Sequence, residues 1–565
     1  MATHQFAAVR DNGIEGTGLF ATAPIRRGEV IWRATLPYRP FQTAEIGTWS
    51  DAIQARFYKY SIQIAADVHL GLAGGATPTE PFSYTNHSCA PNTWWADTGV
   101  LVARHVIAQG AEITYDYATS ESHPRFGLAA CRCGHPQCRK QVSRGDIDDA
   151  AWRAENGVGL IPYLRRTPQD KLTPWWQGGA LHAAPDGLAI GEQRIADLVA
   201  QHGTPLYVYD KARIADQVAL LRTALWLTGK PHKIHYAMKA NRFGPVLAAM
   251  RAELDVGIDA CSPREVALAL ESGFCAPEIS VTASMLADRD LLQFAQQGVH
   301  LNLDSASGLR RYAAIVPKGT FVGLRVDPEA DVGYGTTGKL NYCGGKLGLA
   351  PEDVVSTARY AAELGLVVDT LHMHIGWGIA EKDAPAVAAA LAKLVELAKQ
   401  LPTVRVLNLG GGLGARLQPV DTPLDPLQWG RLVGAAVADL DVTLACEPGT
   451  VLVSQAGMLV VQVNTVHTKK GQQWLGVDAG LGINVYAAHY AAPLSVLTVA
   501  NPLAVATHCY NIAGNINEAA DILARSVGAP FVQEHDLLAF FPAGAYGSSM
   551  ASDHCLRGQF SEVLV

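Results

Sequence analysis

The sequence lacks the features that would place the chain in a membrane or on nucleic acid. No apolar run approaches the roughly 20 residues that a membrane-spanning helix needs, and Met1–Arg10 holds no apolar stretch typical of a secretory signal. With 45 basic and 52 acidic residues the formal net charge is −7, so there is no basic excess to attract a polyanion. These absences predict a cytoplasmic protein that binds neither membrane nor nucleic acid.

Internal repeats are also absent, apart from a long alternation of short β-rich stretches and helical patterns. Of the 565 residues, 49% are hydrophobic and 17% are charged, which is typical of a globular chain with a large core. This length allows three or four domains.

Eight β-rich runs alternate with helical patterns, which are clearest over Pro263–Ser272 and Pro385–Gln400. Eight β-then-α units predict a parallel (β/α)8 barrel, whose active site forms at the C-terminal ends of its strands. The predicted strands are Lys233–Met238, Asp255–Asp259, Glu278–Thr282, Val299–Leu303, Phe321–Val326, Val368–Ile375, Val404–Leu409 and Thr443–Cys446.

Residues capable of chemistry lie at the ends of these strands. Lys239 follows the first strand, where partial desolvation would lower its pKa and free its amine as a nucleophile. Most lysines at strand ends are simply solvated, so the prediction of an active site depends on the whole set. The other members are Asp259, Arg325, His374, Gly410, Gly411, Gly412 and Glu447.

This set fits pyridoxal 5′-phosphate. That cofactor needs a lysine to bind it covalently, an acidic partner for its ring nitrogen, a phosphate cradle and a group that holds the ring flat. Glu447 can keep the ring nitrogen protonated, and His374 can lie against the ring face. The N–H groups of Gly410–Gly412 can approach a phosphate because no Cβ blocks them, although glycine runs also serve as turns.

The chain from about Gly203 to Val565 resembles the ornithine, arginine and diaminopimelate decarboxylases, which have the alanine-racemase-type fold (fold type III). This resemblance implies a second, β-rich domain, built from Leu206–Tyr209 and the residues after about Thr450. It also implies a homodimer with shared active sites. The motifs that carry it are YAMKAN (236–241), MHIG (373–376), LNLGGGLG (407–414), CEPG (446–449), VDAG (477–480) and GAYGSSMAS (544–552).

The same resemblance implies roles for individual residues. Lys239 would be the Schiff-base lysine, His374 the ring-stacking residue and Glu447 the partner of the pyridine nitrogen. The remaining cofactor-binding positions would be Asp259, Arg325 behind the ring, and Gly410, Gly411, Gly412 and Tyr546 on the phosphate.

Departures from the family pattern concern the substrate. The arginine of the family's EPGR motif is Thr450 here, and the serine that usually follows HIG is Trp377. An arginine that grips the far carboxylate in diaminopimelate enzymes corresponds to Tyr486, while Tyr490 matches a family tyrosine. Without a guanidinium the site loses a bidentate carboxylate clamp, which argues against diaminopimelate as substrate.

The C-terminal part of the expected substrate site also differs from the family pattern. Diamine-forming members carry an aspartate where this chain has Ala491, which weakens lysine or ornithine as substrate, although Asp521 could still bind an amine. Glu518 is a further candidate for a substrate contact. The family's CESGD segment corresponds to residues 517–521, so its cysteine, thought to return a proton to the substrate, is Asn517.

Asn517 cannot donate a proton as a thiol does. Either another acid takes the role, or the outcome differs from simple decarboxylation, as in decarboxylative transamination. A second alignment would place Cys509 in the role of the thiol. The candidates for another acid are a water molecule, Tyr546 and His489.

The first 145 residues are β-rich, with helical periodicity mainly over Ser50–Ile64, and end in a cysteine cluster. Three of only ten cysteines, Cys131, Cys133 and Cys138, lie within eight positions, and Cys89 is the candidate for a fourth ligand. In a protein expected to stay reduced, this spacing indicates Zn2+ rather than disulfides.

Residues 10–142 resemble a SET domain with its post-SET zinc loop. The resemblance implies S-adenosylmethionine held by the backbone of Gly16–Gly18, by Asn86 and by His87. Tyr117 would be the phenol that orients an amine for in-line methyl transfer. The matching stretches are GTGLFA (16–21), RGE (27–29), NHSCAPN (86–92) and EITYDY (112–117).

These assignments predict a SET domain at 1–145, a linker at 146–190, a barrel at 226–449, and a β-domain from 191–225 and 450–565. The favoured function is decarboxylation of a specialised amino acid or amino-acid conjugate, together with SET-type N-methylation, in specialised metabolism. Three alternatives remain: a protein-lysine methyltransferase with a retired barrel, a module that merely holds pyridoxal phosphate, and a decarboxylase with a non-catalytic SET docking domain. The last is favoured by a short substrate-reading insert at 47–81 and by Ser83, where many relatives have arginine.

Overall fold

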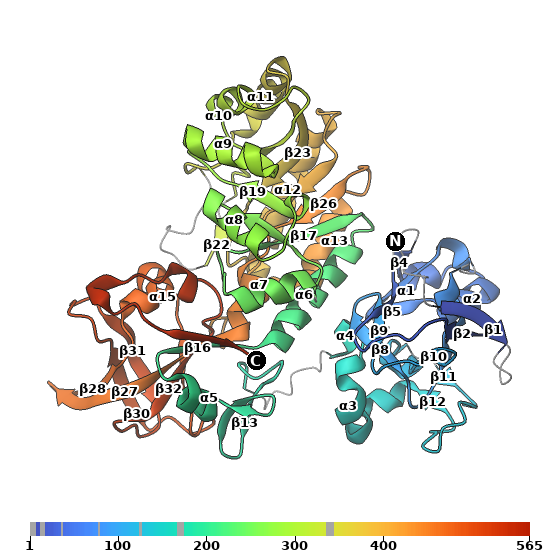
Figure 1. The fold of residues 1–565 in the computed structure, drawn as a ribbon, viewed down its shortest axis with the longest axis horizontal. Helices are drawn as coiled ribbons and strands as arrows, with labels where there is room; N and C mark the ends of the chain where they lie inside the picture. Colours follow the sequence, from blue (N-terminus) through green and yellow to red (C-terminus); the bar gives the residue numbers. More distant parts are fainter. Residues whose placement is uncertain are drawn as a thin grey trace. The chain divides into compact units, whose positions relative to one another are not determined.

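The structure, a computed structural model, describes every residue except 1–6, 12–16, 35–37, 77–79, 124–126, 166–173, 253, 331 and 335–343. The chain forms two compact units (Figure 1), and each is treated by itself. The first contains residues 1–172 and 219–229, and the second contains 173–218 and 230–565. In the described part of the chain, no helix combines the length and the apolar character needed to cross a membrane.

The first unit is built from small sheets. One has the order β1-β2-β10-β7, in which β10 runs antiparallel to β2 and parallel to β7. A second has the order β3-β9-β8 and a third β4-β6-β5. Their bounds are β1 Ala7–Asp11, β2 Thr17–Ala21, β3 Val30–Arg33, β4 Arg39–Gln42, β5 Ile62–Ala65, β6 Val68–Gly71, β7 Asn86–His87, β8 Thr93–Asp97, β9 Val100–Ala103 and β10 Glu112–Tyr115.

One helix of this unit is shorter than its pattern predicts. Helix α2 spans Asp51–Tyr60, whereas the sequence predicts helix over roughly residues 50–64. The last part of that range forms β5, whose residues Ile62–Ala65 are all buried and pair with β6. Pairing in a sheet therefore prevails over helical periodicity. After the cysteine cluster follow the short helices α3 (Ala150–Asn156) and α4 (Pro162–Arg165).

The second unit contains the predicted barrel. Eight parallel strands close in the order β17-β18-β19-β20-β21-β23-β25-β26, and β26 pairs back onto β17. All eight predicted strands are present, so the (β/α)8 prediction is confirmed. Their bounds are β17 His232–Ala237, β18 Gly257–Ala260, β19 Ile279–Thr282, β20 His300–Leu303, β21 Phe321–Val326, β23 Val367–Met373, β25 Val406–Asn408 and β26 Thr443–Cys446.

Helices surround the barrel, and proline residues and side-chain caps mark where several of them begin, as in α8. Helix α8 begins at Pro263, a residue that has no N–H to satisfy, and the Ser262 hydroxyl caps it by accepting from the N–H of Glu265. The helices are α6 Lys211–Trp226, α7 Gly244–Ala252, α8 Pro263–Glu271, α9 Asp288–Gln297, α10 Ala306–Ala313, α11 Pro351–Glu363, α12 Ala384–Lys399 and α13 Pro426–Ala436.

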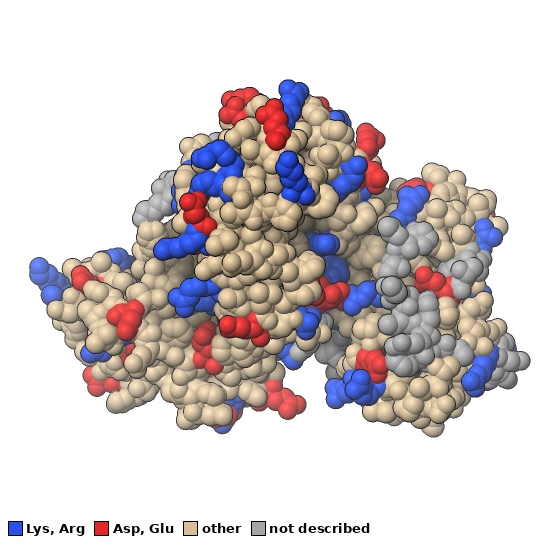
Figure 2. Space-filling view, turned by 45° about the horizontal axis from the view of Figure 1, so that its top comes forward, with Lys and Arg blue, Asp and Glu red and all other residues tan. Residues whose placement is uncertain are grey.

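A β-rich domain flanks the barrel within this unit, as the resemblance implied. Strand β16, before the barrel in sequence, pairs with both β27 and the C-terminal strand β33. Trp176 is buried in its core, so this residue serves packing. The strands are β16 Leu206–Tyr209, β27 Gly457–Lys469, β28 Gln472–Val477, β29 Ser495–Thr498, β30 His508–Ala513, β31 Ile522–Ala529, β32 Leu537–Phe541 and β33 Ser561–Leu564. On the face shown in Figure 2, acidic and basic side chains are interspersed over the barrel.

Candidate active sites

Lys239 lies just beyond β17, beside the neighbouring strand β18. Its Nζ donates to Asp259 Oδ2 at 2.9 Å and lies 3.4 Å from Cys261 Sγ. The side chain is 42% exposed although its partner Asp259 is fully buried, so the amine is reachable from the barrel mouth. Burial alone would lower the pKa of Lys239, as the sequence suggested. Asp259 and the other acidic groups around it instead raise that pKa well above its usual value, which corrects the expectation for the protein without its cofactor.

Asp259 is itself an unusual acid. Burial, together with the nearby charge of Glu447, raises the pKa of Asp259 to about 8, and Lys239 opposes this shift. Its second carboxylate oxygen has no hydrogen-bond partner among the described residues. A buried, half-satisfied carboxyl group at the end of a barrel strand marks a site that is built to receive another group.

Glu447 follows β26 and is held by three other strands of the barrel. Its Oε1 accepts from Asn408 Nδ2 at 2.7 Å and from the Thr282 hydroxyl at 3.1 Å. Its Oε2 lies 2.9 Å from His372 Nε2. Burial would raise the pKa of Glu447, but His372, Lys239 and Asn408 hold it below the usual value. A carboxylate accepts about four hydrogen bonds, so Glu447 still has capacity for a ring N–H.

We expect His372→Leu to destabilise the barrel by about 3–5 kcal/mol, because it removes the hydrogen-bond partner of the Oε2 atom of the buried Glu447 carboxylate. The free energy of unfolding from urea titration, with hydrogen exchange in the β23 and β26 peptides, measures this effect. His467→Leu is the matched control, since His467 is exposed on β27 and its replacement should change stability by less than about 0.5 kcal/mol. Equal effects of the two substitutions would contradict the assigned network.

His374 lies beyond β23, next to the glycine run. Its Nδ1 accepts the N–H of Gly411 at 3.1 Å, and burial, with the charges of Lys239 and Arg325, lowers the pKa of His374 to about 3. The imidazole is therefore neutral at ordinary pH, which suits a ring that stacks on another ring. Arg325, on β21, is also buried at the same end of the barrel.

The glycine run is required by close packing. A Cβ on Gly410 would lie 2.2 Å from the carbonyl oxygen of Met373, and one on Gly411 would lie 2.4 Å from that of Glu447. Gly412, at φ +105°, would meet the carbonyl of Gly376 at 2.5 Å. The N–H of Gly410 already donates to Asn408 Oδ1. The phosphate-binding role of these glycines remains a prediction.

An aromatic wall, defined here as Tyr334, Trp377, Tyr486, Tyr490 and Tyr546, reaches the lysine segment through Tyr546. Its members pack against one another, with Tyr486 stacked on Tyr546 at 5.6 Å between ring centroids. The N–H of Tyr546 donates to the carbonyl of Ala240, the residue after Lys239. The wall is therefore tied to the segment that carries the reactive amine.

Two departures from the family pattern contact each other in this wall. The Trp377 indole N–H donates to the Thr450 hydroxyl at 2.9 Å. Tyr486 is only 3% exposed, and its hydroxyl has no hydrogen-bond partner among the described residues. Burial raises the pKa of Tyr486 well above its usual value, so this hydroxyl stays protonated and can donate a hydrogen bond to an acceptor.

The segment 514–521 organises a loop. Both oxygens of Asp521 accept backbone N–H groups, from Leu481 at 2.6 Å and Ile516 at 2.7 Å. Asp521 therefore stabilises this loop, and its role in binding an amine stays a prediction. Asn517 and Glu518 are exposed, and Glu518 pairs with His554 at 3.2 Å.

Several partners of the site were missed by sequence reasoning. His372 and Asn408 both hold Glu447, and Cys261 contacts the reactive lysine. In the predicted strand Val368–Ile375, His372 stands two residues before His374 and so on the same face, and this spacing was the available signal. Asn408 lies inside the quoted LNLGGGLG motif, but the sequence did not show which carboxylate it serves.

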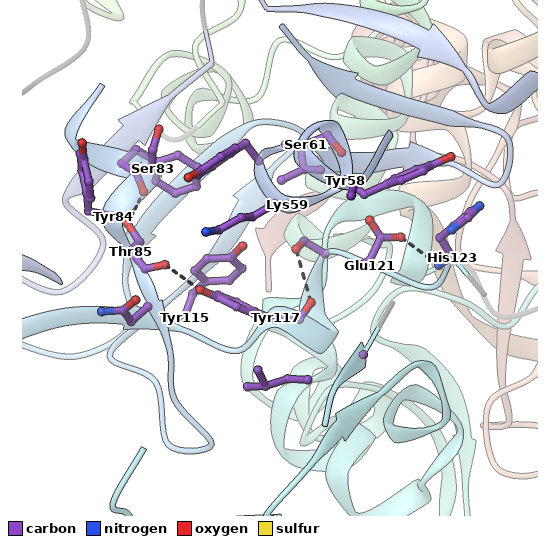
Figure 3. Close-up of a pocket in the computed structure, with 18 of the residues that line it drawn as sticks. Tyr58, Lys59, Ser61, Ser83, Tyr84, Thr85, Tyr115, Tyr117, Glu121 and His123 are labelled. Carbon is purple, nitrogen blue, oxygen red and sulfur yellow. Dashed lines mark hydrogen bonds between the residues drawn. The ribbon is translucent and has the colours of Figure 1, made fainter. Parts of the chain in front are cut away.

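In the first unit, a cavity of about 800 Å³ lies beside β7 and β10 (Figure 3). Tyr117 and Asn86, two predicted SET-site residues, line it, and the Tyr117 hydroxyl donates to the carbonyl of Thr85 at 3.2 Å. Asn86 Nδ2 donates to Glu112 Oε1 at 2.8 Å. The structure therefore brings the predicted amine-orienting phenol and the predicted cosubstrate-binding amide to one cavity.

Two other residues predicted to bind S-adenosylmethionine, His87 and Gly18, are not among the described residues that line this cavity. The His87 ring faces the cysteines, with Nε2 at 3.3 Å from Cys89 Sγ and Nδ1 accepting the N–H of Tyr117. The assignment of His87 to S-adenosylmethionine stays a prediction. Burial lowers the pKa of His87 to about 4, so the ring is neutral. Gly18 packs tightly against the side chain of Glu112. Gly16 lies outside the described residues.

The four predicted metal ligands come together. The Sγ atoms of Cys89, Cys131, Cys133 and Cys138 all lie within 4.8 Å of one another, and the Cys89–Cys131 pair is 3.9 Å apart. A tetrahedral zinc site with bonds of about 2.3 Å places its sulfurs about 3.8 Å apart. The residues present therefore fit a zinc site with four cysteine ligands, and the His87 N–H supports one ligand from outside the first sphere.

A closed (β/α)8 barrel with an accessible lysine, a buried glutamate and a neutral histidine at one end defines the class of barrel enzymes that use pyridoxal phosphate. Residues 211–454 match the family "Pyridoxal-dependent decarboxylase, pyridoxal binding domain", and residues 16–118 match the SET domain family. The predicted resemblances to both families are thus confirmed.

Known proteins extend the match beyond the barrel. The diaminopimelate decarboxylases of Methanothermobacter thermautotrophicus and Pseudomonas fluorescens are each 33% identical, over 395 and 404 residues. These alignments cover 67% and 69% of this chain, and 90% and 92% of the relatives. The crystal structure of diaminopimelate decarboxylase from Helicobacter pylori, complexed with L-lysine, superposes with a TM-score of 0.61 at 25% identity, covering 66% of this chain and 93% of that one. The chain belongs to the pyridoxal-dependent decarboxylases and is a carboxy-lyase, with a SET domain at its N-terminal end.

Proposed function

We propose that the barrel decarboxylates an amino acid, or an amino-acid conjugate, whose far end is uncharged and carries a hydrogen-bond acceptor. The observation that supports this most directly is the unpartnered Tyr486 hydroxyl, buried in the aromatic wall. A carboxylate at the far end of the substrate would need a cationic partner. Diaminopimelate enzymes supply an arginine for it, and this chain has Tyr486 at that position. The substrate class therefore differs from the one in the names of the relatives.

The residues of the barrel end fit pyridoxal phosphate, which when bound supplies an electron sink for loss of CO2. Lys239 would hold the cofactor, Glu447 would hold a proton at its ring nitrogen, and neutral His374 would lie on its face. Asp259 keeps the Lys239 amine in place. The aromatic wall excludes water from the substrate's far end. A group other than the family's thiol would return the proton to the α-carbon, because Asn517 stands in place of the cysteine and has no thiol.

Release of CO2 across a panel of amino acids tests the substrate class. We expect uncharged, amide- or ester-bearing amino acids to exceed meso-diaminopimelate by at least about tenfold in kcat/KM, the equivalent of about 1.4 kcal/mol. Tyr486→Arg should shift the preference toward diaminopimelate, because it introduces a guanidinium that can bind a carboxylate bidentately. Tyr486→Phe is the matched control and should lower kcat/KM only for substrates with an acceptor. Preference of the unaltered protein for diaminopimelate would contradict the proposal.

A homodimer forms part of this proposal. In the family the active sites lie between two subunits, and the loop of Asn517 and Glu518 is exposed in the single chain. We assign this loop to the partner's active site.

For the first unit we propose an S-adenosylmethionine-dependent N-methyltransferase with a structural Zn2+ ion held by the four cysteines. The proposal is supported by the cavity that Tyr117 and Asn86 share, and by the tetrahedral fit of the sulfurs. The second candidate, a docking domain without catalysis, is favoured by Ser83 in the cavity wall, where many relatives have arginine. Only the methyltransferase would bind S-adenosylhomocysteine in this cavity.

A further inference from the structure

The cavity beside Tyr117 contains a lysine of the chain itself. Lys59 stands in the last turn of α2 and lines the same cavity as Tyr117 and Asn86. In Figure 3 its side chain extends between Tyr115 and the Ser83–Thr85 segment. None of the carboxylates in the described part of the chain forms an ion pair with it.

The walls of this cavity suit an alkylammonium group. Five tyrosines line it, among them Tyr84, and aromatic faces attract cations. The Lys59 ammonium already lies 5.3 Å from the ring centroid of Tyr60. Glu121 contributes a carboxylate whose side chain is only 10% exposed and which is held 3.4 Å from His69. The other three tyrosines are Tyr58, Tyr115 and Tyr117.

We propose that Lys59 is a methyl acceptor of its own SET domain, so that the chain methylates itself at this position. The inference rests on the proposed methyltransferase function and names its acceptor. The Lys59 amine, after losing its proton to water, takes the methyl group of S-adenosylmethionine. The N–C bond forms as the S–C bond breaks, S-adenosylhomocysteine leaves, and no oxidant or reductant is consumed.

The position of Lys59 makes the transfer intramolecular. Because α2, strand β7 with Asn86, and Tyr117 just after β10 belong to one compact unit, acceptor and catalytic residues share a cavity before any second molecule arrives. Orientation within one molecule replaces a bimolecular encounter, so the rate per chain should not depend on protein concentration.

Peptide mass spectrometry of the full-length holoprotein tests this assignment. We expect one or more methyl groups on the peptide containing Lys59, in the protein as isolated from cells, with more after incubation with labelled S-adenosylmethionine. Lys59→Arg should remove at least about nine tenths of the label while leaving S-adenosylhomocysteine binding, measured by calorimetry, unchanged. Lys469→Arg, at an exposed β27 terminus, is the matched control and should keep all of the label. Tyr117→Phe should lower labelling of Lys59 without removing S-adenosylhomocysteine binding.

The possible results separate this inference from the function it rests on. Methyl transfer to added lysine peptides, with Lys59 unlabelled, would overturn the assignment of Lys59 and leave the methyltransferase standing. Absence of both S-adenosylhomocysteine binding and methyl transfer would overturn both and favour the docking domain. A rate of Lys59 labelling per chain that rises in proportion to protein concentration would contradict the intramolecular route.

Discussion

Lys239→Ala should abolish the near-visible absorbance of the bound cofactor and lower decarboxylation by about 10³-fold or more, at the upper end of the range for loss of a proton-transferring group. The reason is structural: the Lys239 amine is the reachable nitrogen at the barrel mouth, held by Asp259 at 2.9 Å and close to Glu447. Spectra of the purified holoprotein and CO2 release with the best substrate of the panel measure the two effects.

Lys233→Ala is the matched control, because Lys233 lies on β17, the strand that leads to Lys239, but its side chain is exposed. It should leave both the spectrum and the rate unchanged. A normal spectrum and rate in Lys239→Ala would contradict the assignment. Loss of both in the Lys233 variant would show that any change in this strand disrupts the barrel.

Cys131→Ser should remove zinc from the protein and unfold the first unit. A structural zinc ion contributes an apparent ~10–16 kcal/mol in small zinc domains at neutral pH, as large as the ~5–15 kcal/mol that typically separates folded from unfolded states. Cys131 is buried, and its thiol is 3.9 Å from Cys89 Sγ at the centre of the cluster. Metal content by mass spectrometry and protease sensitivity of residues 1–165 report the loss.

Cys509→Ser serves as control, since Cys509 is exposed on β30 in the other unit. It should keep the full zinc content. Metal-free protein with an intact, protease-resistant first unit would contradict a structural role for the ion. Decarboxylation should survive in the Cys131 variant, because the cofactor site is built within the second unit alone.

The barrel could be predicted from the sequence because its signals are local. Each of its strands is a short apolar run, bounded by helical periodicity, and the eight observed strands fall within the predicted runs or within a residue of them. The reactive residues could be placed for the same reason. In a parallel barrel the residue after any strand lies at the same end, so Lys239, His374 and Glu447 converge whatever the details of packing.

The partners of these residues could not be predicted. The bonds from Asn408, Thr282 and His372 to Glu447 depend on the stagger of strands far apart in sequence. The same limit applies to Asp521. The sequence makes it a candidate to bind the amine of a substrate, but it did not show that Asp521 accepts two backbone N–H groups of its own domain. Sequence shows which groups exist, whereas their hydrogen-bond partners are fixed by tertiary contact.

Two other features became visible only in three dimensions. Trp377 and Thr450 are separate departures from the family pattern, yet they form one hydrogen-bonded pair in the aromatic wall. Lys59 stands in a helix far from any quoted motif, and only the fold of the first unit places it on the same cavity as Asn86 and Tyr117.

Borohydride reduction of the purified holoprotein, followed by peptide mapping, tests the central claim most directly, because it fixes the cofactor covalently to whichever amine holds it. The account predicts a pyridoxyl group on Lys239 and on no other lysine. A pyridoxyl group on a different lysine, or an unmodified Lys239 in protein that still releases CO2, would contradict it.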